Sequence, residues 1–382
     1  MKKLRAAIIG TGFMGRVHLE GVLRLGSVDV HAVCGRRLER ARALADEFDV
    51  EKAESDYRTV LADRGVDVIH ICTPNAAHFP VALAALAAGK HVLCEKPLTT
   101  TSQEAEQLVA AARERARRNC TCHNLRYYPL VQQMRRMREE GELGDILVAQ
   151  GTYSQDWLLY DTDWNWRVDV HDTGPLRAMS DIGSHWCDMV EHVTGQRIAS
   201  VCADLATFHK RRKRPARTAD DTFARQTPGS DHGLAVDVST DDFGAVLFRL
   251  GSGGRGAFTV SQVSAGCKNR LSLEIYGTKA GAAWNQERPD ELWIGNRDTG
   301  NQLILKDPSL LTGDARSYAD LPGGHSEGYA DTFKQIFRRF YHSIEDQNAP
   351  PEYPQFEDGL RQLRILEAEL ASHQRRGWVD VA

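Results

Sequence analysis

Two pairs of acidic and histidine side chains stand four residues apart in the middle of the chain. Asp181 precedes His185, and Asp188 precedes His192. If residues 180–193 form a helix, side chains four apart lie on one face, so a carboxylate and an imidazole can meet at one hydroxyl group. An imidazole with an ordinary pKa of roughly 6.5 takes and returns a proton near neutral pH. The same spacing also arises from a plain contact on a helix surface, so spacing alone does not choose between the pairs.

A glycine-spaced turn lies near the start of the chain. Gly10, Gly12 and Gly15 follow an apolar run and precede a segment of helical pattern. In such a turn the first glycine permits a sharp bend, the second lets the backbone approach phosphates, and the third lets the helix pack on the strand. Free N–H groups at the helix start attract an anion. The turn predicts a dinucleotide site, and a glycine-rich loop without a ligand is the alternative. The predicted cofactor contacts here are Gly10, Thr11, Gly12, Phe13, Met14 and Gly15.

Apolar runs alternate with amphipathic segments of helical length in the first third of the chain. We expect strands at residues 4–9, 28–34, 66–72 and 91–94, and helices at residues 16–25, 38–48, 79–88 and 102–118. This alternation is typical of βαβ units and predicts a doubly wound parallel sheet, the Rossmann fold, over residues 1–122. Thr101 and Glu104 have capping-box spacing, which predicts the start of the last helix.

The pattern changes after residue 122. A helical stretch at residues 130–140 and a run at 145–153 lead into an aromatic-rich segment, and alternating runs follow at 245–250, 256–260 and 270–276. Short strands separated by glycine turns predict a large, open and mainly antiparallel sheet. Two helices, at 329–345 and 357–374, are expected to close the chain. The sequence therefore predicts a second domain of the α+β class over residues 123–382.

Composition and charge exclude several classes of function. The chain has 382 residues, of which 42% are hydrophobic, enough for two domains with cores of their own. A net charge of -4 offers no broad basic field to nucleic acid, and the basic run at residues 210–215 is expected to be a solvated loop. No run approaches the roughly 20 apolar residues of a membrane span. Eight scattered cysteines suggest reduced thiols, so we expect a soluble, cytoplasmic protein. Cys120, Cys122 and His123 lack a second ligand pair, so no metal site is predicted.

Polar residues follow two of the predicted strands at their carboxyl ends. The tripeptide Thr73-Pro-Asn75 follows the strand at residues 66–72, and Glu95-Lys-Pro97 follows the strand at 91–94. In an open α/β sheet, ligands bind in the crevice at this edge. One such turn is ordinary at the start of a loop, but two in one nucleotide-binding frame predict a ligand crevice.

These segments together resemble the Gfo/Idh/MocA oxidoreductase family, named for glucose-fructose oxidoreductase and inositol dehydrogenase. The matching segments are Gly10-Thr-Gly-Phe-Met-Gly15, Cys72-Thr-Pro-Asn75 with His78, Ala88-Gly-Lys-His-Val92, Glu95-Lys-Pro97 and Asp181-Ile-Gly-Ser-His185. The resemblance spans nearly the whole chain. It implies a second domain whose open sheet serves assembly into a homodimer or homotetramer, and a cis peptide bond before Pro97.

The resemblance also implies the chemistry, which is hydride transfer between a secondary alcohol and nicotinamide. His185 would be the general base, Asp181 would orient its imidazole and bind substrate hydroxyls, and Lys96 would present positive charge where alkoxide character develops. Lys96 would also lie against the nicotinamide ribose. Further cofactor contacts are expected from Thr73, Pro74, Asn75, His78, Glu95 and Asn124.

The end of the second predicted strand bears on the choice between NAD and NADP. An acid at this position commonly holds the ribose hydroxyls of NAD, whereas an arginine accepts the 2'-phosphate of NADP. Here Arg36 and Arg37 follow the strand and no acid does. The sequence therefore predicts NAD(P)(H) binding with a preference for NADP. If an arginine merely stacks on adenine, NAD stays acceptable.

Substrate contacts are expected from aromatic and polar residues of the second domain. Aromatic rings offer apolar faces to the C–H faces of a sugar, and polar side chains satisfy its hydroxyls. The segments at residues 153–157, 163–167 and 322–325 look most like the sugar-oxidising branch of the family, which includes levoglucosan and inositol dehydrogenases. Gly174-Pro-Leu-Arg177 departs from the Gly/Ser-rich stretch expected there. The candidates, for which core packing or an ordinary loop is the competing account, are Arg126, Tyr153, Trp157, Trp166 and His325, beside Lys96, Asp181 and His185.

The leading prediction is an NAD(P)-dependent oxidoreductase that acts on a ring hydroxyl of a sugar, anhydrosugar or cyclic polyol. A second hypothesis is an oxidoreductase that keeps its cofactor bound and shuttles hydride between two sugars. A third is a non-catalytic dinucleotide or sugar sensor on the same fold. The joint presence of Lys96, Asp181 and His185 argues against the sensor.

Overall fold

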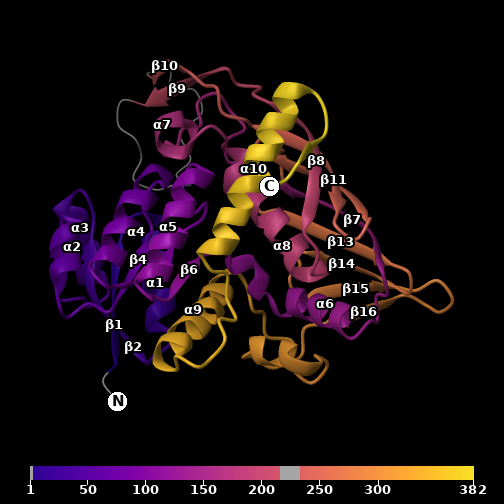
Figure 1. The fold of residues 1–382 in the computed structure, drawn as a ribbon, viewed down its shortest axis with the longest axis horizontal. Helices are drawn as coiled ribbons and strands as arrows, with labels where there is room; N and C mark the ends of the chain where they lie inside the picture. Colours follow the sequence, from indigo (N-terminus) through magenta and orange to yellow (C-terminus); the bar gives the residue numbers. More distant parts are fainter. Residues whose placement is uncertain (1–2, 216–232) are drawn as a thin grey trace.

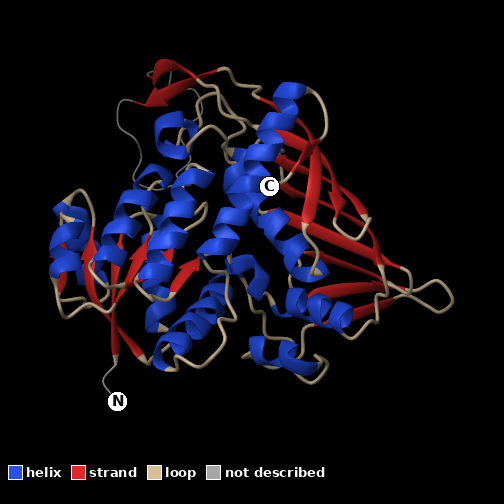
Figure 2. Cartoon of the chain, viewed as in Figure 1, coloured by secondary structure: helices blue, strands red, loops and turns tan. Residues whose placement is uncertain are grey.

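Two sheets of different design stand side by side in the computed structural model, which describes residues 3–215 and 233–382 (Figure 1). The N-terminal part holds a parallel sheet between helices. The larger part holds a broad sheet with helices packed between it and the N-terminal part (Figure 2). None of the helices within the described ranges has both the length and the apolar character needed to cross a membrane.

The N-terminal sheet has six parallel strands in the order β3-β2-β1-β4-β5-β6. The strands are β1 (Leu4–Ile9), β2 (Val28–Cys34), β3 (Lys52–Glu54), β4 (Val68–Ile71), β5 (His91–Cys94) and β6 (Asn119–Thr121). The helices are α1 (Phe13–Leu23), α2 (Leu38–Glu47), α3 (Tyr57–Ala62), α4 (His78–Ala87) and α5 (Ser102–Glu114). The predicted doubly wound parallel sheet is therefore confirmed. Because all strands run the same way, the turns after β1, β2, β4 and β5 lie at one edge of the sheet.

The start of α5 forms only half of the predicted capping box. The Thr101 hydroxyl accepts a hydrogen bond from the Glu104 N–H at 3.3 Å, as expected. The Glu104 carboxylate instead accepts bonds from the N–H and hydroxyl of Thr100, at 3.2 and 3.0 Å. The helix begins where the spacing predicted, although the return bond goes to the preceding residue.

The second sheet has nine strands in the order β16-β15-β14-β13-β7-β12-β11-β8-β17. They are β7 (Ile146–Ser154), β8 (Ile198–Ala206), β11 (Phe243–Leu250), β12 (Arg255–Ser261), β13 (Arg270–Gly277), β14 (Gly281–Asn285), β15 (Glu291–Gly295), β16 (Gln302–Leu305) and β17 (Val379–Asp380). β12 pairs with β7 in parallel, and the other neighbours pair antiparallel. The prediction of a mainly antiparallel sheet is confirmed. Helices α6 (Pro129–Glu139), α8 (Ser184–Thr194) and α10 (Phe356–Arg375) cover its inner face (Figure 1).

The last two helices return to the N-terminal part. α9 (Tyr329–Glu345) packs on α1, and α10 packs on α5 (Figure 1). Gly21 of α1 makes the first contact possible, because a Cβ atom there would lie 2.8 Å from the ring of Phe337. The division of the chain at residues 122 and 123 stays a prediction. β6 ends next to it, at Thr121.

The basic run is not a solvated loop. Its residues form β9 (Arg211–Pro215), which pairs antiparallel with β10 (Gly233–Asp237). Arg212 is fully buried, and its guanidinium donates to Oδ1 of Asp242 at 2.8 Å and to the Tyr160 carbonyl at 2.7 Å. Arg177, from the segment that departs from the family pattern, is also fully buried and also pairs with Asp242. The expectation fails because tertiary pairing with Asp242 compensates for burying these charges.

Candidate active site

The three glycines of the predicted phosphate turn have different structural roles. Gly10 has φ +125°, and a Cβ atom there would lie 2.3 Å from the Cys72 carbonyl oxygen, so only glycine fits between β1 and β4. A Cβ atom at Gly15 would lie 1.9 Å from the Gly10 carbonyl oxygen. Gly12 differs, because no described atom lies within 4 Å of where its Cβ would be. It caps α1 with extended backbone and no side-chain hydrogen bond. The backbone is therefore open at Gly12, directly before α1, which fits the close approach of a dinucleotide pyrophosphate to the helix start.

The two arginines after β2 lie at the same edge of the sheet. Arg36 and Arg37 are both exposed, and Arg37 is the N-cap residue of α2. Gly35 lets this turn approach the phosphate turn, since a Cβ atom there would lie 2.5 Å from the methyl group of Thr11. Both arginines therefore stand at the end of the second strand, where a dinucleotide fold holds the adenosine ribose.

His78 and Asn75 bind neighbouring segments of the protein at the predicted ligand edge of the parallel sheet. The His78 ring is fully buried, with Nδ1 2.8 Å from the Pro97 carbonyl oxygen and Nε2 2.9 Å from that of Thr73. It thereby joins the turns after β4 and β5. The Asn75 amide donates to the Thr173 carbonyl at 3.1 Å. Their side chains bind the protein itself, so direct cofactor contacts from them stay a prediction.

Asn124 and Glu95 are likewise engaged inside the protein. The Asn124 amide donates to the Thr332 hydroxyl at 2.8 Å, which ties the start of the second part to α9. Glu95 is buried and accepts a hydrogen bond from the Lys96 N–H at 3.2 Å. The next peptide bond, between Lys96 and Pro97, is cis, as the resemblance implied.

Lys96 and Asp181 meet where the two parts of the molecule join. Lys96 follows β5, and Asp181 belongs to a π-helical turn, Met179–Gly183, that leads into α8. Lys96 Nζ lies 3.0 Å from Asp181 Oδ1 and 2.6 Å from the Asp181 carbonyl oxygen. The two side chains are only 11% and 13% exposed. The ammonium is therefore held in one place by two oxygens of a single residue.

Arg167, which ends one of the predicted substrate segments, and Gln262, which the sequence did not single out, complete the surroundings of Asp181. Arg167 Nε donates to Oδ1 at 3.0 Å, and the Gln262 amide donates to Oδ2 at 2.9 Å. Burial alone would raise the pKa of the Asp181 carboxyl. The nearby positive charges of Arg167 and Lys96 outweigh burial and lower that pKa below its usual range. Asp181 is therefore ionised throughout the neutral range.

His185 lies on the first turn of α8, close to these groups but not bonded to Asp181. Its ring is 5.7 Å from that of His123 and 6.4 Å from that of Tyr153, centroid to centroid. Nδ1 is buried and bonds to none of the described residues. Burial, then the positive charges of Lys96 and His123, hold the pKa of His185 well below 6.5. The imidazole is therefore neutral at physiological pH.

The imidazole of His185, which Asp181 was expected to orient, donates no hydrogen bond to the Asp181 carboxylate among the described contacts. Residues 179–183 make a π-helical turn, so the regular four-residue alignment of an α-helix does not apply to this pair. Asp181 has its oxygens occupied by Lys96, Arg167 and Gln262 instead.

The second pair, Asp188 and His192, has structural contacts. Asp188 pairs with Arg126, Nε to Oδ2 at 2.7 Å, and the Gln132 amide lies 3.1 Å from His192 Nε2. Arg126 also contacts Asp358 at 3.1 Å. Its guanidinium is thus held in a buried ion cluster, and substrate binding by Arg126 stays a prediction.

Two of the three aromatic candidates, Tyr153 and Trp166, lie near Asp181, whereas Trp157 packs beside Leu158 and Val168. The Tyr153 hydroxyl donates to Asn269 at 2.8 Å, and Trp157 Nε1 donates to Gln155 at 2.7 Å. Trp166 packs under the guanidinium of Arg167, 4.4 Å from ring centroid to Cζ. The polar atoms of Tyr153 and Trp157 bind neighbouring side chains, and Tyr153 is buried in the core. Substrate contacts from Tyr153, Trp157 and Trp166 stay a prediction.

His325 lies on an exposed turn before α9. Its Nδ1 is 3.2 Å from the Gly323 carbonyl oxygen, and its own carbonyl accepts from Lys306 Nζ at 2.7 Å. No contact between described residues joins it to Lys96, Asp181 or His185. Its role in the pocket stays a prediction.

Comparisons with known proteins agree with this geometry. Residues 4–123 match the oxidoreductase family with an NAD-binding Rossmann fold, and residues 131–283 match the GFO/IDH/MocA C-terminal domain. Levoglucosan dehydrogenase from Pseudarthrobacter phenanthrenivorans is 29% identical over 397 aligned residues, which cover 100% of this chain and 99% of that protein. Inositol 2-dehydrogenase from Salmonella typhimurium is 34% identical over 153 residues, or 39% of this chain and 46% of that protein.

Solved structures give the same result over the full length. An oxidoreductase domain protein from Kribbella flavida superimposes with a TM-score of 0.90 at 31% identity and covers 100% of both chains. Levoglucosan dehydrogenase in complex with NADH and L-sorbose also gives 0.90, at 27% identity and 100% of both chains. The chain therefore belongs to the Gfo/Idh/MocA family of oxidoreductases and carries that family's NAD-binding Rossmann domain.

Proposed function

We propose that the chain transfers a hydride between a ring secondary alcohol of a sugar, anhydrosugar or cyclic polyol and NAD(P). The single observation that carries this proposal is the position of Lys96. Lys96 follows β5 at the ligand edge of the Rossmann sheet. Its ammonium binds Asp181 from the second part of the chain and lies near a neutral His185. The relatives that bear the names levoglucosan dehydrogenase and inositol 2-dehydrogenase support the substrate class.

Four side chains of the site have separate roles in this reaction. When bound, NAD(P) supplies the nicotinamide that accepts or gives the hydride. Neutral His185 takes the proton from the substrate hydroxyl, because a neutral imidazole keeps a lone pair that can accept it. Lys96 stabilises the developing alkoxide charge. Asp181 holds the ammonium in place, and Arg167 shares the charge of its carboxylate.

The cofactor preference is proposed to be NADP. Two exposed arginines follow β2, and none of the residues directly after that strand is acidic. Levoglucosan dehydrogenase was solved with NADH, so relatives of this fold accept NAD. Initial rates with both cofactors decide: NADP is expected to give the higher kcat/KM in the wild type. Arg36→Ala combined with Arg37→Ala should reverse the order, and an NAD preference in the wild type would contradict the assignment.

We also propose that the chain assembles into oligomers through the open face of its second sheet. Large apolar side chains stand exposed on strands whose other face is covered by helices, and they include Leu147, Leu247, Leu303 and Leu305. A homodimer or homotetramer would bury them. Light scattering after size exclusion should give two or four times the chain mass of 42.6 kDa, and a monomer at micromolar concentration would contradict this.

The decisive test of the activity is a panel of sugars, anhydrosugars and cyclic polyols with each cofactor, followed by absorbance of reduced nicotinamide. At least one cyclic secondary alcohol should be oxidised. Cofactor that survives desalting, with turnover only when two sugars are supplied, would favour the hydride shuttle. Cofactor binding without turnover across the panel would favour the sensor.

A further inference from the structure

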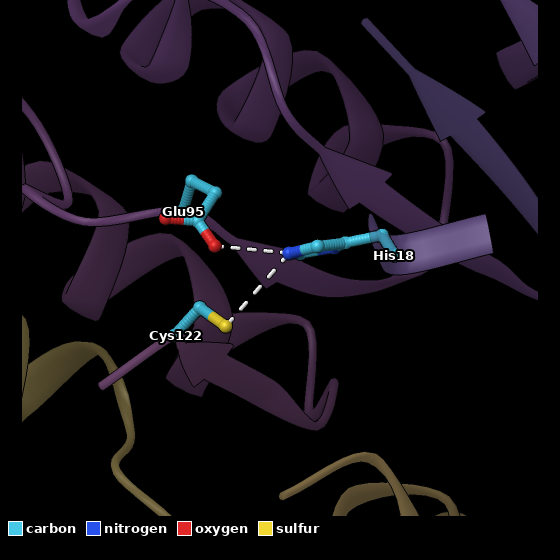
Figure 3. Close-up of side chains that lie close together, drawn as sticks. All are labelled: His18, Glu95 and Cys122. Atoms are coloured by element: carbon cyan, nitrogen blue, oxygen red, sulfur yellow. Dashed lines mark hydrogen bonds and ion pairs between the residues drawn. The ribbon is translucent and has the colours of Figure 1, made fainter. Parts of the chain in front are cut away.

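A continuous chain of buried hydrogen bonds runs behind Lys96. Glu95 Oε1 lies 2.9 Å from His18 Nε2, and His18 Nδ1 lies 3.0 Å from His70 Nδ1. His70 Nε2 in turn lies 2.8 Å from the Tyr341 hydroxyl. All four side chains are buried, and both imidazoles are completely inaccessible. The first contact of the chain is drawn in Figure 3.

The chain crosses the elements that build the site. Glu95 follows β5 directly before Lys96, His18 lies on α1, and His70 lies on β4. Tyr341 lies on α9, which belongs to the C-terminal end of the sequence. One line of hydrogen bonds therefore connects the residue before Lys96 with the phosphate-binding helix and with α9.

The charge of Glu95 decides which atom donates in the hydrogen bond that it forms with His18. Its carboxylate accepts from the Lys96 N–H at 3.2 Å and from His18, and the Cys122 thiol also lies against it. Burial would raise the pKa of Glu95, but the bond from His18 and nearby positive charge lower it below its ordinary value. An ionised carboxylate only accepts hydrogen bonds. His18 therefore carries its proton on Nε2.

The remaining tautomers follow one by one. A neutral His18 with its proton on Nε2 offers a bare Nδ1, and this arrangement calls for a proton on His70 Nδ1. His70 Nε2 is then bare and accepts from the Tyr341 hydroxyl. Complete burial, together with His18, keeps the pKa of His70 well below 6.5, which agrees with a neutral ring. With both rings neutral, Glu95 is the one charged group among these four side chains, and Cys122 Sγ lies 3.8 Å from His18 Nε2 beside it.

We propose that Tyr341, His70 and His18 are positioning residues that hold Glu95 as a buried carboxylate and, through it, the backbone of Lys96. This inference rests on the proposed role of Lys96. The other oxygen of Glu95, Oε2, takes the Lys96 N–H, so both oxygens of one carboxylate are used. If the bond from His18 is lost, the carboxylate keeps a buried charge with one donor fewer, and the Lys96 peptide loses its fixed acceptor.

A metal ion is the competing occupant of the same place. His18, Glu95 and Cys122 bring an imidazole nitrogen, a carboxylate oxygen and a sulfur within 4.8 Å of one another, as Figure 3 shows. Zinc binds such donors. A structural zinc site takes four ligands, whereas three come together within the described ranges. Burial also raises the pKa of the Cys122 thiol well above its ordinary value, which opposes the thiolate that zinc requires.

The two readings predict opposite tautomers. A metal on His18 Nε2 forces the proton onto Nδ1, so His70 would carry its proton on Nε2 and donate to Tyr341. Long-range proton–nitrogen NMR of the full chain, labelled with nitrogen-15 in histidine, distinguishes the two forms. His18→Gln and His70→Asn identify the resonances by their loss. We expect Nε2–H on His18 and Nδ1–H on His70. The reverse pattern, or stoichiometric metal by elemental analysis of the purified protein, would overturn the proposal.

Kinetics separate positioning from simple packing. His18→Leu removes the donor to Glu95 and should lower kcat about tenfold or more through misplacement of Lys96. His18→Gln keeps an N–H donor and should restore most of that loss. Tyr341→Phe should lower kcat more than Tyr353→Phe, which removes a buried hydroxyl whose one hydrogen bond within the described residues is to Ser343, away from Glu95, His18 and His70. The dissociation constant for the cofactor should change less than about threefold, since the glycine turn is untouched.

The outcomes distinguish this inference from the proposed function. Wild-type kcat in His18→Leu and Tyr341→Phe would reject positioning even if the tautomers are as expected. The NMR measurement needs no substrate, so expected tautomers in a protein without turnover would count against the activity. Reversed tautomers in an active enzyme would count against the proposed positioning of Glu95 by His18 and His70.

Discussion

Lys96 and Asp181 are 85 residues apart in the sequence, yet Lys96 Nζ lies 3.0 Å from Asp181 Oδ1. One residue follows a strand of the Rossmann sheet, and the other opens the helix that packs under the second sheet. The cationic end of the site is therefore formed only when the two parts of the molecule are docked. Changes at either residue should affect both activity and stability.

Asp181→Asn should damage activity and folding together. It removes the charge that balances Lys96 and Arg167 in a nearly closed site, and breaking one partner of a buried pair costs about 3 kcal/mol. We expect kcat/KM to fall by roughly two orders of magnitude. Glu191→Gln is the matched control, since it breaks the similarly buried pair with Arg361 outside the candidate site. It should cost similar stability in a denaturant titration with a much smaller loss of kcat, and equal losses of kcat would contradict the assignment.

The pH profile should report His185. A general base must be neutral, and burial, Lys96 and His123 hold the pKa of this ring well below 6.5. Tyr153 and Asp181 are the other groups that face it. The acidic limb of kcat/KM should therefore lie below pH 6.5. Lys96→Met removes one positive charge and should move that limb upward, toward 6.5. A wild-type limb at or above 6.5, or no movement in the variant, would exclude His185 as the base.

Two glycines of one turn should respond differently to alanine. At Gly12 a methyl group meets no described atom and φ is -85°, so Gly12→Ala should fold normally. The methyl enters the space proposed for phosphate, so cofactor affinity should fall about tenfold or more. Gly10→Ala should instead destabilise the fold, because φ is +125° and the Cys72 carbonyl lies 2.3 Å away. Thermal unfolding and cofactor titration measure both, and unchanged cofactor affinity in Gly12→Ala would move the phosphate site elsewhere.

Glu369→Gln should stabilise the protein in a pH-dependent way. Burial raises the pKa of this carboxyl to about 8 from 4.5. Between those values the folded chain holds a proton that the unfolded chain releases, so wild-type stability falls as pH rises. Glutamine mimics the protonated acid. The advantage of the variant should grow by up to about 1.4 kcal/mol per pH unit from 4.5 to 8 and then level off. A constant difference across this range would show that Glu369 is ionised in the fold.

Long periodic elements of the fold could be predicted from sequence. β1, β2, β5 and α9 have the predicted bounds, because each carries several residues of clear apolar pattern. β3 and β6 were not predicted, since three residues are too few to show a period. The parallel pairing of β12 with β7 depends on contacts between distant segments, and no local pattern encodes it.

The candidate site shows the same limit. Lys96, Asp181 and His185 lie in recognisable motifs at strand and helix ends. Gln262 could not be found, because it follows β12 and reaches Asp181 across 81 residues. The contact expected between Asp181 and His185 assumed an α-helix, and the π-helical turn changes which residues share a face. Charge balance is a further signal, since a buried carboxylate requires cationic partners from somewhere in the fold.

The proposed role of Lys96 is tested most directly by measuring both the turnover and the cofactor affinity of Lys96→Ala. With the cyclic alcohol found in the substrate panel, kcat should fall by roughly two to four orders of magnitude, while the NAD(P) dissociation constant changes only a few-fold. His185→Ala should behave in the same way. Wild-type turnover in both variants would contradict the central claim that these two side chains carry the chemistry.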